Sequence, residues 1–463
     1  MRSDRLFWLV VVLGAFFSIL MLVRSQVAGD QLNMLARGWF LITAGEWIPF
    51  GLPTSAGGKA PGGFTALVAG LPLLLWRHHR APTLLILVLQ ILAYVLLDRL
   101  VSRVTGRNGR LLFAILYWLS PWRLYHSTFL WNPNYMLFFG ALHLWCIYRQ
   151  RQRAHLWASF LLVLAIGLPA QLHASAILLV PLSIVLWWRR YFKIHLGGAI
   201  LGAAVVAASL LPWLLAVLQD PSLLPRGGGL LASGLRPLSY LTRGLGYWLR
   251  LDSLAVSDSM YCLDFSALIG SSGGQAVAPI LPAIWWILGL LTVPVAVWAN
   301  LRLWRHAGSW WKSAPKRSSK RTWLKGVVRW SFLIVLLSCF VSPTTPMSWQ
   351  IVVLLHLAVL PSVLAGTALL RSSRHRLALR GTGLYLVLTC MLLLAMSFGS
   401  PMYRCGGYRC EAMNVTHPIL RSDHPMLDEL GIQATCGFEI NQPGGWWPDV
   451  LPETESTPAP VRQ

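Results

Sequence analysis

The sequence predicts an all-α, polytopic membrane protein. Of its 463 residues, 56% are hydrophobic and only 12% are charged, and the mean hydropathy is +0.57. A soluble chain carries roughly 25% charged residues. The apolar stretches are Leu-, Val- and Ala-rich runs, many of them near the ~20 residues that cross a hydrocarbon layer. They are continuous, without the alternation of an outer-membrane barrel.

About eleven spanning helices are expected. The first run has no small-residue cleavage site, so we interpret it as a retained helix and not as a signal peptide. The predicted spans are 6–24, 81–100, 110–126, 133–149, 155–171, 175–189, 195–218, 279–299, 329–343, 347–369 and 381–397.

The net charge of +23 lies mainly in short loops between these runs. The basic residues of these loops are Arg149, Arg151, Arg153, Arg189, Arg190, Lys193, Arg302, Arg305, Lys312, Lys316, Arg317, Lys320, Arg321, Lys325, Arg329, Arg371, Arg374, Arg376 and Arg380. Short basic loops mark the cytoplasmic side of a membrane. The charge therefore indicates orientation and excludes nucleic-acid binding. We expect a bacterial inner-membrane protein with a cytoplasmic N-terminus and a periplasmic C-terminus.

Residues 64–76 form a short apolar segment that carries Gly70 and Pro72. Counting it as a span would put every later basic loop outside, so we expect an interfacial or re-entrant segment, which needs protein or water around it. The alternative is that it spans and that the turn at 77–80 is cytoplasmic.

The expected organisation is a transmembrane module at 1–220 with a first external loop at 25–63. An outside loop at 221–278, C-terminal helices at 279–397 and a small outside tail at 398–463 follow. The outside regions contain Cys262, Cys405, Cys410 and Cys436. In an oxidising compartment these allow two disulfides whose pairing stays open; zinc is the weaker interpretation, because no His-x3–5-His partner accompanies them.

Asp30 is the first candidate for chemistry. It follows the first apolar run, and the next residues, 31–45, have apolar side chains at helical spacing, which indicates an amphipathic helix on the outer surface. A carboxylate there could take a proton from an acceptor hydroxyl. The alternative is a hydrated acid at a helix end.

Lys59 lies in a stretch rich in Gly and Pro, residues 51–63. Glycine lets backbone N–H groups approach a ligand closely, and the lysine adds a point charge suited to phosphate. A carboxylate base beside such a cation is what sugar transfer from a lipid phosphate requires, because the cation neutralises charge on the departing group.

These features, followed by Leu119-Ser-Pro-Trp-Arg-Leu-Tyr-His126 and by Trp131-Asn-Pro-Asn134, resemble the GT-C fold glycosyltransferases. The similar group is the protein-mannosyltransferase and aminoarabinose-transferase-like (family 39-like) superfamily, over roughly residues 1–220. The resemblance implies a GT-C-like fold, a polyprenyl-phosphate sugar donor used outside the membrane, Asp30 as base and Lys59 as phosphate ligand.

The chain departs from that pattern at two places. Many members have Asp-Glu at the first site, whereas Gln31 follows Asp30, and many have another acid where this chain has Asn132 and Asn134. A divalent metal is therefore not supported, and we expect no metal or other cofactor.

Further candidates lie at outer turns. Asn132 and Asn134 could orient a sugar hydroxyl or simply form a turn and cap. Arg123 could bind the donor phosphate or snorkel to the interface. Gln171 and His173 are polar residues between two apolar runs, with substrate binding or a structural histidine as the two interpretations.

The sequence thus favours a membrane glycosyltransferase acting with inversion on an envelope lipid, glycan or protein acceptor. The alternative is a transporter or flippase of a lipid-linked sugar. That alternative predicts symmetry between halves and charges inside spans, and neither is seen. A non-catalytic scaffold would not depend on Asp30.

Overall fold

The computed structural model describes residues 2–23, 25, 27, 29–53, 59–221, 238–256, 280–305, 319–342, 344–399 and 425–432. Cys262, Cys405, Cys410 and Cys436 lie outside the described residues, so their disulfide pairing stays a prediction.

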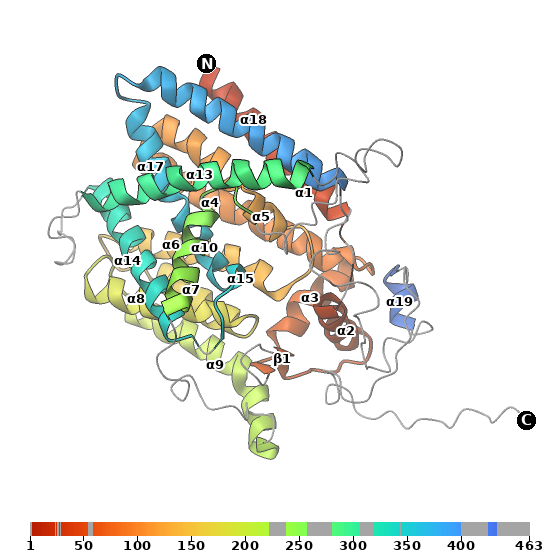
Figure 1. Ribbon diagram of the computed structural model, residues 1–463. Helices are drawn as coiled ribbons and strands as arrows, with labels where there is room; N and C mark the ends of the chain where they lie inside the picture. Colours follow the sequence, from red (N-terminus) through yellow and green to blue (C-terminus); the bar gives the residue numbers. More distant parts are fainter. Residues whose placement is uncertain are drawn as a thin grey trace, which may run out of the picture.

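The N-terminal half contains α1 (Arg2–Val23), α2 (Gly29–Thr43), β1 (Phe50–Pro53), β2 (Lys59–Pro61), α3 (Phe64–Leu75), α4 (Arg80–Phe113), the π-helix η1 (Ala114–Trp118), α5 (Pro121–Tyr125), η2 (Asn132–Tyr135), α6 (Met136–Arg149), α7 (Leu156–Ala170), η3 (Ala174–Leu178), α8 (Leu179–Trp188) and α9 (Leu196–Gln219). The remainder contains α10 (Leu238–Leu251), α13 (Ile280–Arg305), α14 (Lys320–Phe340), α15 (Ser348–Ile351), η5 (Val352–Leu354), α16 (Leu355–Ala358), α17 (Leu360–Leu369), α18 (His375–Gly399) and α19 (Pro425–Glu429). Figure 1 shows α1 and α18 side by side, and α19 beside α2 and α3.

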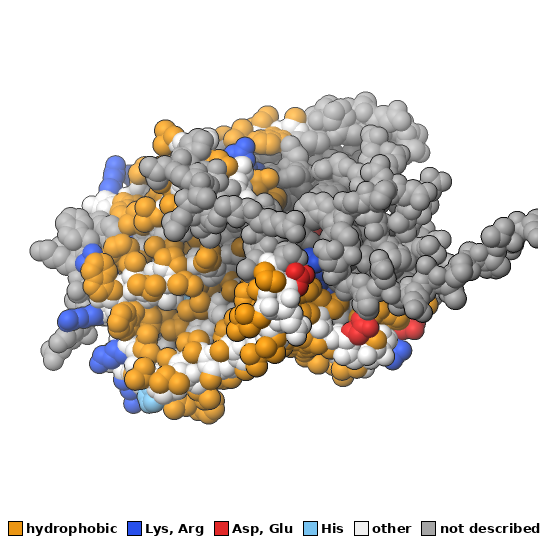
Figure 2. Space-filling model, turned by 90° about the horizontal axis from the view of Figure 1, so that it is seen from below, with side chains coloured by type: hydrophobic (Ala, Val, Ile, Leu, Met, Phe, Trp, Pro, Cys, Tyr) orange, Lys and Arg blue, Asp and Glu red, His pale blue; other side chains and the backbone are white. Residues whose placement is uncertain are grey.

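The protein is a multi-pass helical membrane protein. Among the described residues, seven helices are long and apolar enough to cross a membrane: Asp4–Val23, Arg80–Trp118, Leu196–Gln219, Trp286–Arg305, Lys320–Phe340, Ser348–Leu369 and His375–Leu394. Shorter apolar helices are Phe64–Leu75, Leu156–Ala170 and Ala174–Trp188. Large apolar side chains stay exposed along several of them, as lipid contact requires. Figure 2 shows hydrophobic side chains over much of one face, with several Lys and Arg side chains along its left edge.

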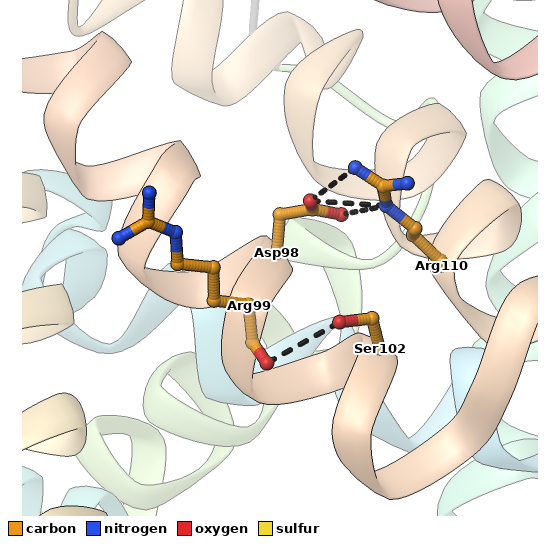
Figure 3. A network of polar contacts seen from close by, with 4 residues as sticks. All are labelled: Asp98, Arg99, Ser102 and Arg110. Atoms are coloured by element: carbon orange, nitrogen blue, oxygen red, sulfur yellow. Dashed lines mark hydrogen bonds and ion pairs between the residues drawn. The ribbon is translucent and has the colours of Figure 1, made fainter.

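The helix α4 contains a sharp reversal at Gly106, whose φ of 76° suits glycine. Tyr94 stacks on Phe113 and on Trp118, with ring centroids 6.3 and 4.7 Å apart, so the two limbs lie side by side. Asp98 accepts hydrogen bonds from Arg110 Nε (2.8 and 3.0 Å) and Nη2 (2.7 Å) across the reversal, as Figure 3 shows. The predicted spans 81–100 and 110–126 therefore form a helical hairpin.

The first external loop folds into α2 and a small hairpin in which β1 pairs antiparallel with β2. Helices α2 and α3 approach closely at Gly38 and Gly70; a Cβ on Gly38 would lie 2.6 Å from the Gly70 backbone nitrogen. Residues 64–75 form the 12-residue apolar helix α3, with Pro72 inside it, and its non-spanning character stays a prediction.

The all-helical prediction is confirmed, apart from the short β1–β2 hairpin. The predicted number of spans is corrected. Fewer than the eleven predicted spans are long, because predicted spans 133–149, 155–171 and 175–189 are the shorter helices α6, α7 and η3–α8. Helices α14 and α18 begin at Lys320 and His375, before the predicted spans 329–343 and 381–397. The Lys and Arg side chains in these first turns continue the helix while their charged ends reach water.

Candidate functional site

The carboxylate of Asp30 lies in the first turn of α2, shortly after α1 ends at Val23. An acid is favoured there, since the first turn of a helix carries partial positive charge. Asp30 Oδ2 accepts a hydrogen bond from Trp131 Nε1 at 2.9 Å. Burial raises the pKa of this partly buried carboxyl above its usual range, and the Trp131 hydrogen bond opposes part of the rise.

Trp131 joins several elements at this site. Its ring stacks on His126, with centroids 6.0 Å apart and planes 7° from parallel, and on Phe129 at 5.7 Å. The edge of Trp349, from α15, meets the same ring at 5.6 Å. The indole therefore fixes the Asp30 carboxylate relative to the α5–η2 loop and to the C-terminal half of the chain.

His126 is fixed by Asn134. Its Nδ1 lies 2.8 Å from Asn134 Oδ1, while Asn134 Nδ2 donates to the Phe129 carbonyl at 2.7 Å. Because an amide oxygen only accepts, Nδ1 carries the proton and Nε2 presents a lone pair. That Nε2 is buried and has no hydrogen-bond partner among the described residues. Burial lowers the pKa of His126 to about 4, so the ring is neutral at neutral pH.

His173 is a second neutral imidazole near His126. Its Nδ1 accepts from the Ser175 backbone N–H at 3.2 Å and lies 2.8 Å from Ser175 Oγ, so the proton sits on Nε2. Burial lowers the pKa of His173 to about 3, and repulsion from the protonated form of His126 adds to this effect. The site thus offers one imidazole acceptor and one imidazole donor.

Asn132 and Gln171 connect the surrounding backbone. Asn132 Nδ2 donates to the Leu172 carbonyl at 2.9 Å, and Gln171 Nε2 donates to Ser209 Oγ at 2.6 Å. Gln171 Oε1 is buried without a hydrogen-bond partner among the described residues and packs against Gly62. These amides tie the end of α7 to η2 and to α9.

Two cations meet at Phe50 in β1. Arg37 Nε donates to Asn33 Oδ1 at 2.7 Å, and its Nη1 donates to the Phe50 carbonyl. Lys59 Nζ lies 4.9 Å from the centroid of the Phe50 ring. Arg37 is 1% exposed, and its Nη2 is without a hydrogen-bond partner among the described residues. Burial lowers the pKa of Arg37 to about 9, which leaves it charged at neutral pH.

Arg123 is in α5, three residues before His126. Its guanidinium donates to the Trp118 carbonyl, to Ser18 Oγ (2.7 Å) and to Ser127 Oγ (3.3 Å), and it lies 3.9 Å from the centroid of the Trp118 ring. The structure therefore links Asp30 through Trp131 and His126 to Asn134. Asn132 follows Trp131 in the chain and His173 lies near His126, whereas Arg123 holds α5 to α1. Its phosphate-binding role stays a prediction.

Sequence reasoning missed Arg37, Trp131 and His126 as site residues. A signal for Arg37 was present, because Asp30, Asn33 and Arg37 are spaced i, i+3, i+7 and share one helix face. In the part of the chain that the structure describes, no group of three or more His, Cys, Asp or Glu side chains could hold a metal ion.

No family model matches the chain, and no curated protein matches it in sequence. Among solved structures, it is similar to the crystal structure of ArnT from Cupriavidus metallidurans bound to undecaprenyl phosphate, with 15% identity and a TM-score of 0.48 over 86% of this chain and 76% of that chain. The apo-state structure of that ArnT is also similar, with 15% identity and a TM-score of 0.41 over 86% and 78%. ArnT is a GT-C aminoarabinose transferase, the group that the sequence resembles.

Proposed function

We propose that the protein is an inverting membrane glycosyltransferase that moves a sugar from a polyprenyl-phosphate donor to an envelope lipid, glycan or protein. The observation that carries the proposal is Asp30. Its partly buried carboxylate has a raised pKa and a fixed orientation, and it shares a helix face with the buried cation Arg37.

The spacing on α2 suits this substrate. Asp30 and Arg37 are seven residues apart, and a helix rises 1.5 Å per residue, so they are separated by about 10 Å along its axis. A sugar ring fits between a base and a phosphate ligand at that separation. Arg37 Nη2 supplies a charged donor for the phosphate, and Lys59, beside the same Phe50, supplies a second positive charge.

Asp30 would remove the proton from the acceptor hydroxyl as that oxygen attacks the anomeric carbon. The bond from the anomeric carbon to the phosphate oxygen breaks, and polyprenyl phosphate leaves with the electron pair. A carboxylate of raised pKa is a stronger base than an exposed one. Arg37 and Lys59 would stabilise the charge that grows on the leaving phosphate.

The neutral histidines would position the sugar. His126 Nε2 can accept from a sugar hydroxyl and His173 Nε2 can donate to one, since both rings stay neutral at neutral pH. Asn132 and Asn134 would act beside them, Asn134 by fixing His126. Undecaprenyl phosphate, seen bound to ArnT, is the carrier lipid of choice for a first assay.

The location and domain roles belong to the same proposal. The site faces the outside of a bacterial inner membrane, with the N-terminus in the cytoplasm. Residues 1–220 form the catalytic module, and the loop 221–278 and the tail 398–463 lie on the same outer side.

The test is a transfer assay with the purified protein in proteoliposomes, a panel of radiolabelled undecaprenyl-phosphate sugars and a crude envelope extract as acceptor. Label that enters the acceptor and depends on the protein supports a transferase. Label that stays on the lipid but crosses the bilayer contradicts it and assigns the protein as a flippase.

A further inference from the structure

A cavity of about 130 Å³ lies between the first limb of α4 and the end of α6. Its lining residues are Arg99, Leu100, Arg103, Trp145, Tyr148 and Arg149. By the volume of liquid water, about 30 Å³ per molecule, it has room for roughly four waters. That space suits the polar end of a ligand and not a whole sugar nucleotide.

The cavity lies at the other end of the helices from the Asp30 site. Helix α6 begins just after Asn134 and reaches Arg149 after 14 residues, or about 21 Å. On α4, Gln90 Nε2 donates to the Asn134 carbonyl, whereas Arg99 comes nine residues later, about 13 Å along the helix. The cavity is therefore on the opposite membrane face, where the basic loops predict cytoplasm.

Its positive charge has no acidic partner within the part of the chain that the structure describes. Arg99, Arg103 and Arg149 are exposed, and none forms an ion pair with another described residue. The nearby acid Asp98 is bound by Arg110. Figure 3 shows the Arg99 guanidinium directed away from that pair. Three like charges that share a cavity repel one another, and an anion would relieve the repulsion.

The other lining residues of the cavity are of the kinds found at the boundary between membrane and water. Trp145 and Tyr148 are aromatic residues of the kind that gather at headgroup level, and the Arg149 guanidinium lies 5.7 Å from the centroid of the Trp145 ring. Leu100 supplies an apolar wall, and guanidinium groups bind phosphate oxygens in a planar, bidentate manner. We propose that this cavity binds the phosphodiester headgroup of an anionic membrane lipid, as basic pockets between helices on the cytoplasmic side do.

The test is native mass spectrometry of the full-length protein with phosphatidylglycerol and, separately, phosphatidylcholine. The variant Arg99→Gln/Arg103→Gln/Arg149→Gln removes three charges while keeping good helix formers. The matched control is Arg374→Gln/Arg376→Gln/Arg380→Gln, which removes three exposed charges outside the cavity on the same predicted membrane face. Thermal unfolding in phosphatidylcholine nanodiscs shows whether both variants fold.

Each basic residue near an anionic lipid contributes roughly fivefold to affinity, so the cavity variant should bind phosphatidylglycerol about a hundredfold more weakly. The control should bind as the unaltered protein does, and phosphatidylcholine binding should not change. Equal weakening in both variants would overturn the proposal in favour of general surface charge. Displacement of phosphatidylglycerol by inorganic phosphate would overturn it in favour of a free-anion site.

Discussion

The substitution Trp131→Phe probes how the protein tunes Asp30. It removes the indole N–H that donates to Asp30 Oδ2 at 2.9 Å but keeps an aromatic ring to stack on His126. Burial raises the pKa of the Asp30 carboxyl, and this hydrogen bond lowers it. Its loss should therefore raise that pKa further.

The size of the shift follows from the strength of the bond. A hydrogen bond to a charged group contributes about 1.5–3 kcal/mol, and about 1.36 kcal/mol corresponds to one pH unit. Because Asp30 is only partly buried, water replaces part of the lost bond, and we expect a shift of about one pH unit. A base must be ionised, so transfer falls as pH drops through its pKa, and in the variant this fall should begin at higher pH.

The assay is kcat/KM for sugar transfer against pH in nanodiscs of neutral lipid. Trp39→Phe is the matched control, because Trp39 is on the same helix α2 and donates its indole N–H to Glu429 at 2.9 Å, away from Asp30. His126 and His173, with pKa values of about 4 and 3, should add no step near neutral pH. If kcat/KM falls at the same low pH in Trp131→Phe and in the unaltered protein, the Trp131 hydrogen bond does not set the pKa of Asp30. An equal shift in Trp39→Phe would lead to the same conclusion.

Three further predictions concern residues around the site and the fold. Arg37→Gln should raise KM for the donor about tenfold to a hundredfold, since a hydrogen bond to a charged phosphate is lost; an unchanged KM with intact folding would remove Arg37 as a phosphate ligand. Gly62→Ala should lower Tm, because Gly62 has φ of 82° and a Cβ would overlap Gln171, whereas Gly246→Ala, with nothing within 4 Å, should not. The destabilisation expected for Gly62→Ala is about 1–3 kcal/mol. Asp98→Asn should weaken the α4 hairpin by about 1 kcal/mol, since Arg110 is partly exposed. The readout is thermal unfolding against Arg380→Gln, which breaks no ion pair among the described residues.

Local sequence pattern was sufficient for the position of Asp30. The apolar run that becomes α1 ends at Val23, and the apolar spacing of the next residues predicts α2, so a carboxylate in the first turn follows directly. The break between the predicted spans 81–100 and 110–126 contains Gly106, where the chain reverses.

The contacts that complete the site could not be predicted, because they join distant residues. Trp131 and Asp30 are 101 positions apart, and the ring of Trp349 comes from the other half of the chain. The hairpin looked like a loop because Gly and Pro dominate it. In the structure, Arg37 donates a hydrogen bond to the Phe50 carbonyl of this hairpin, and Gln171 packs closely on Gly62.

The contacts of Arg123 could not be predicted from sequence, and its phosphate-binding role stays a prediction. It precedes the asparagines at 132 and 134 closely enough to suggest phosphate binding. In the structure its hydrogen bonds go to Trp118, Ser18 and Ser127, because α5 packs against α1.

The measurement that tests the central claim most directly is single-turnover sugar transfer by Asp30→Asn. Asp220→Asn, the same change at an exposed acid after α9, is the control, and donor binding is measured in parallel. We expect Asp30→Asn to lose about 10²–10⁴-fold in transfer rate while its donor binding is unchanged, and Asp220→Asn to transfer at close to the unaltered rate. Transfer by Asp30→Asn at the unaltered rate would contradict the assignment of Asp30 as the base.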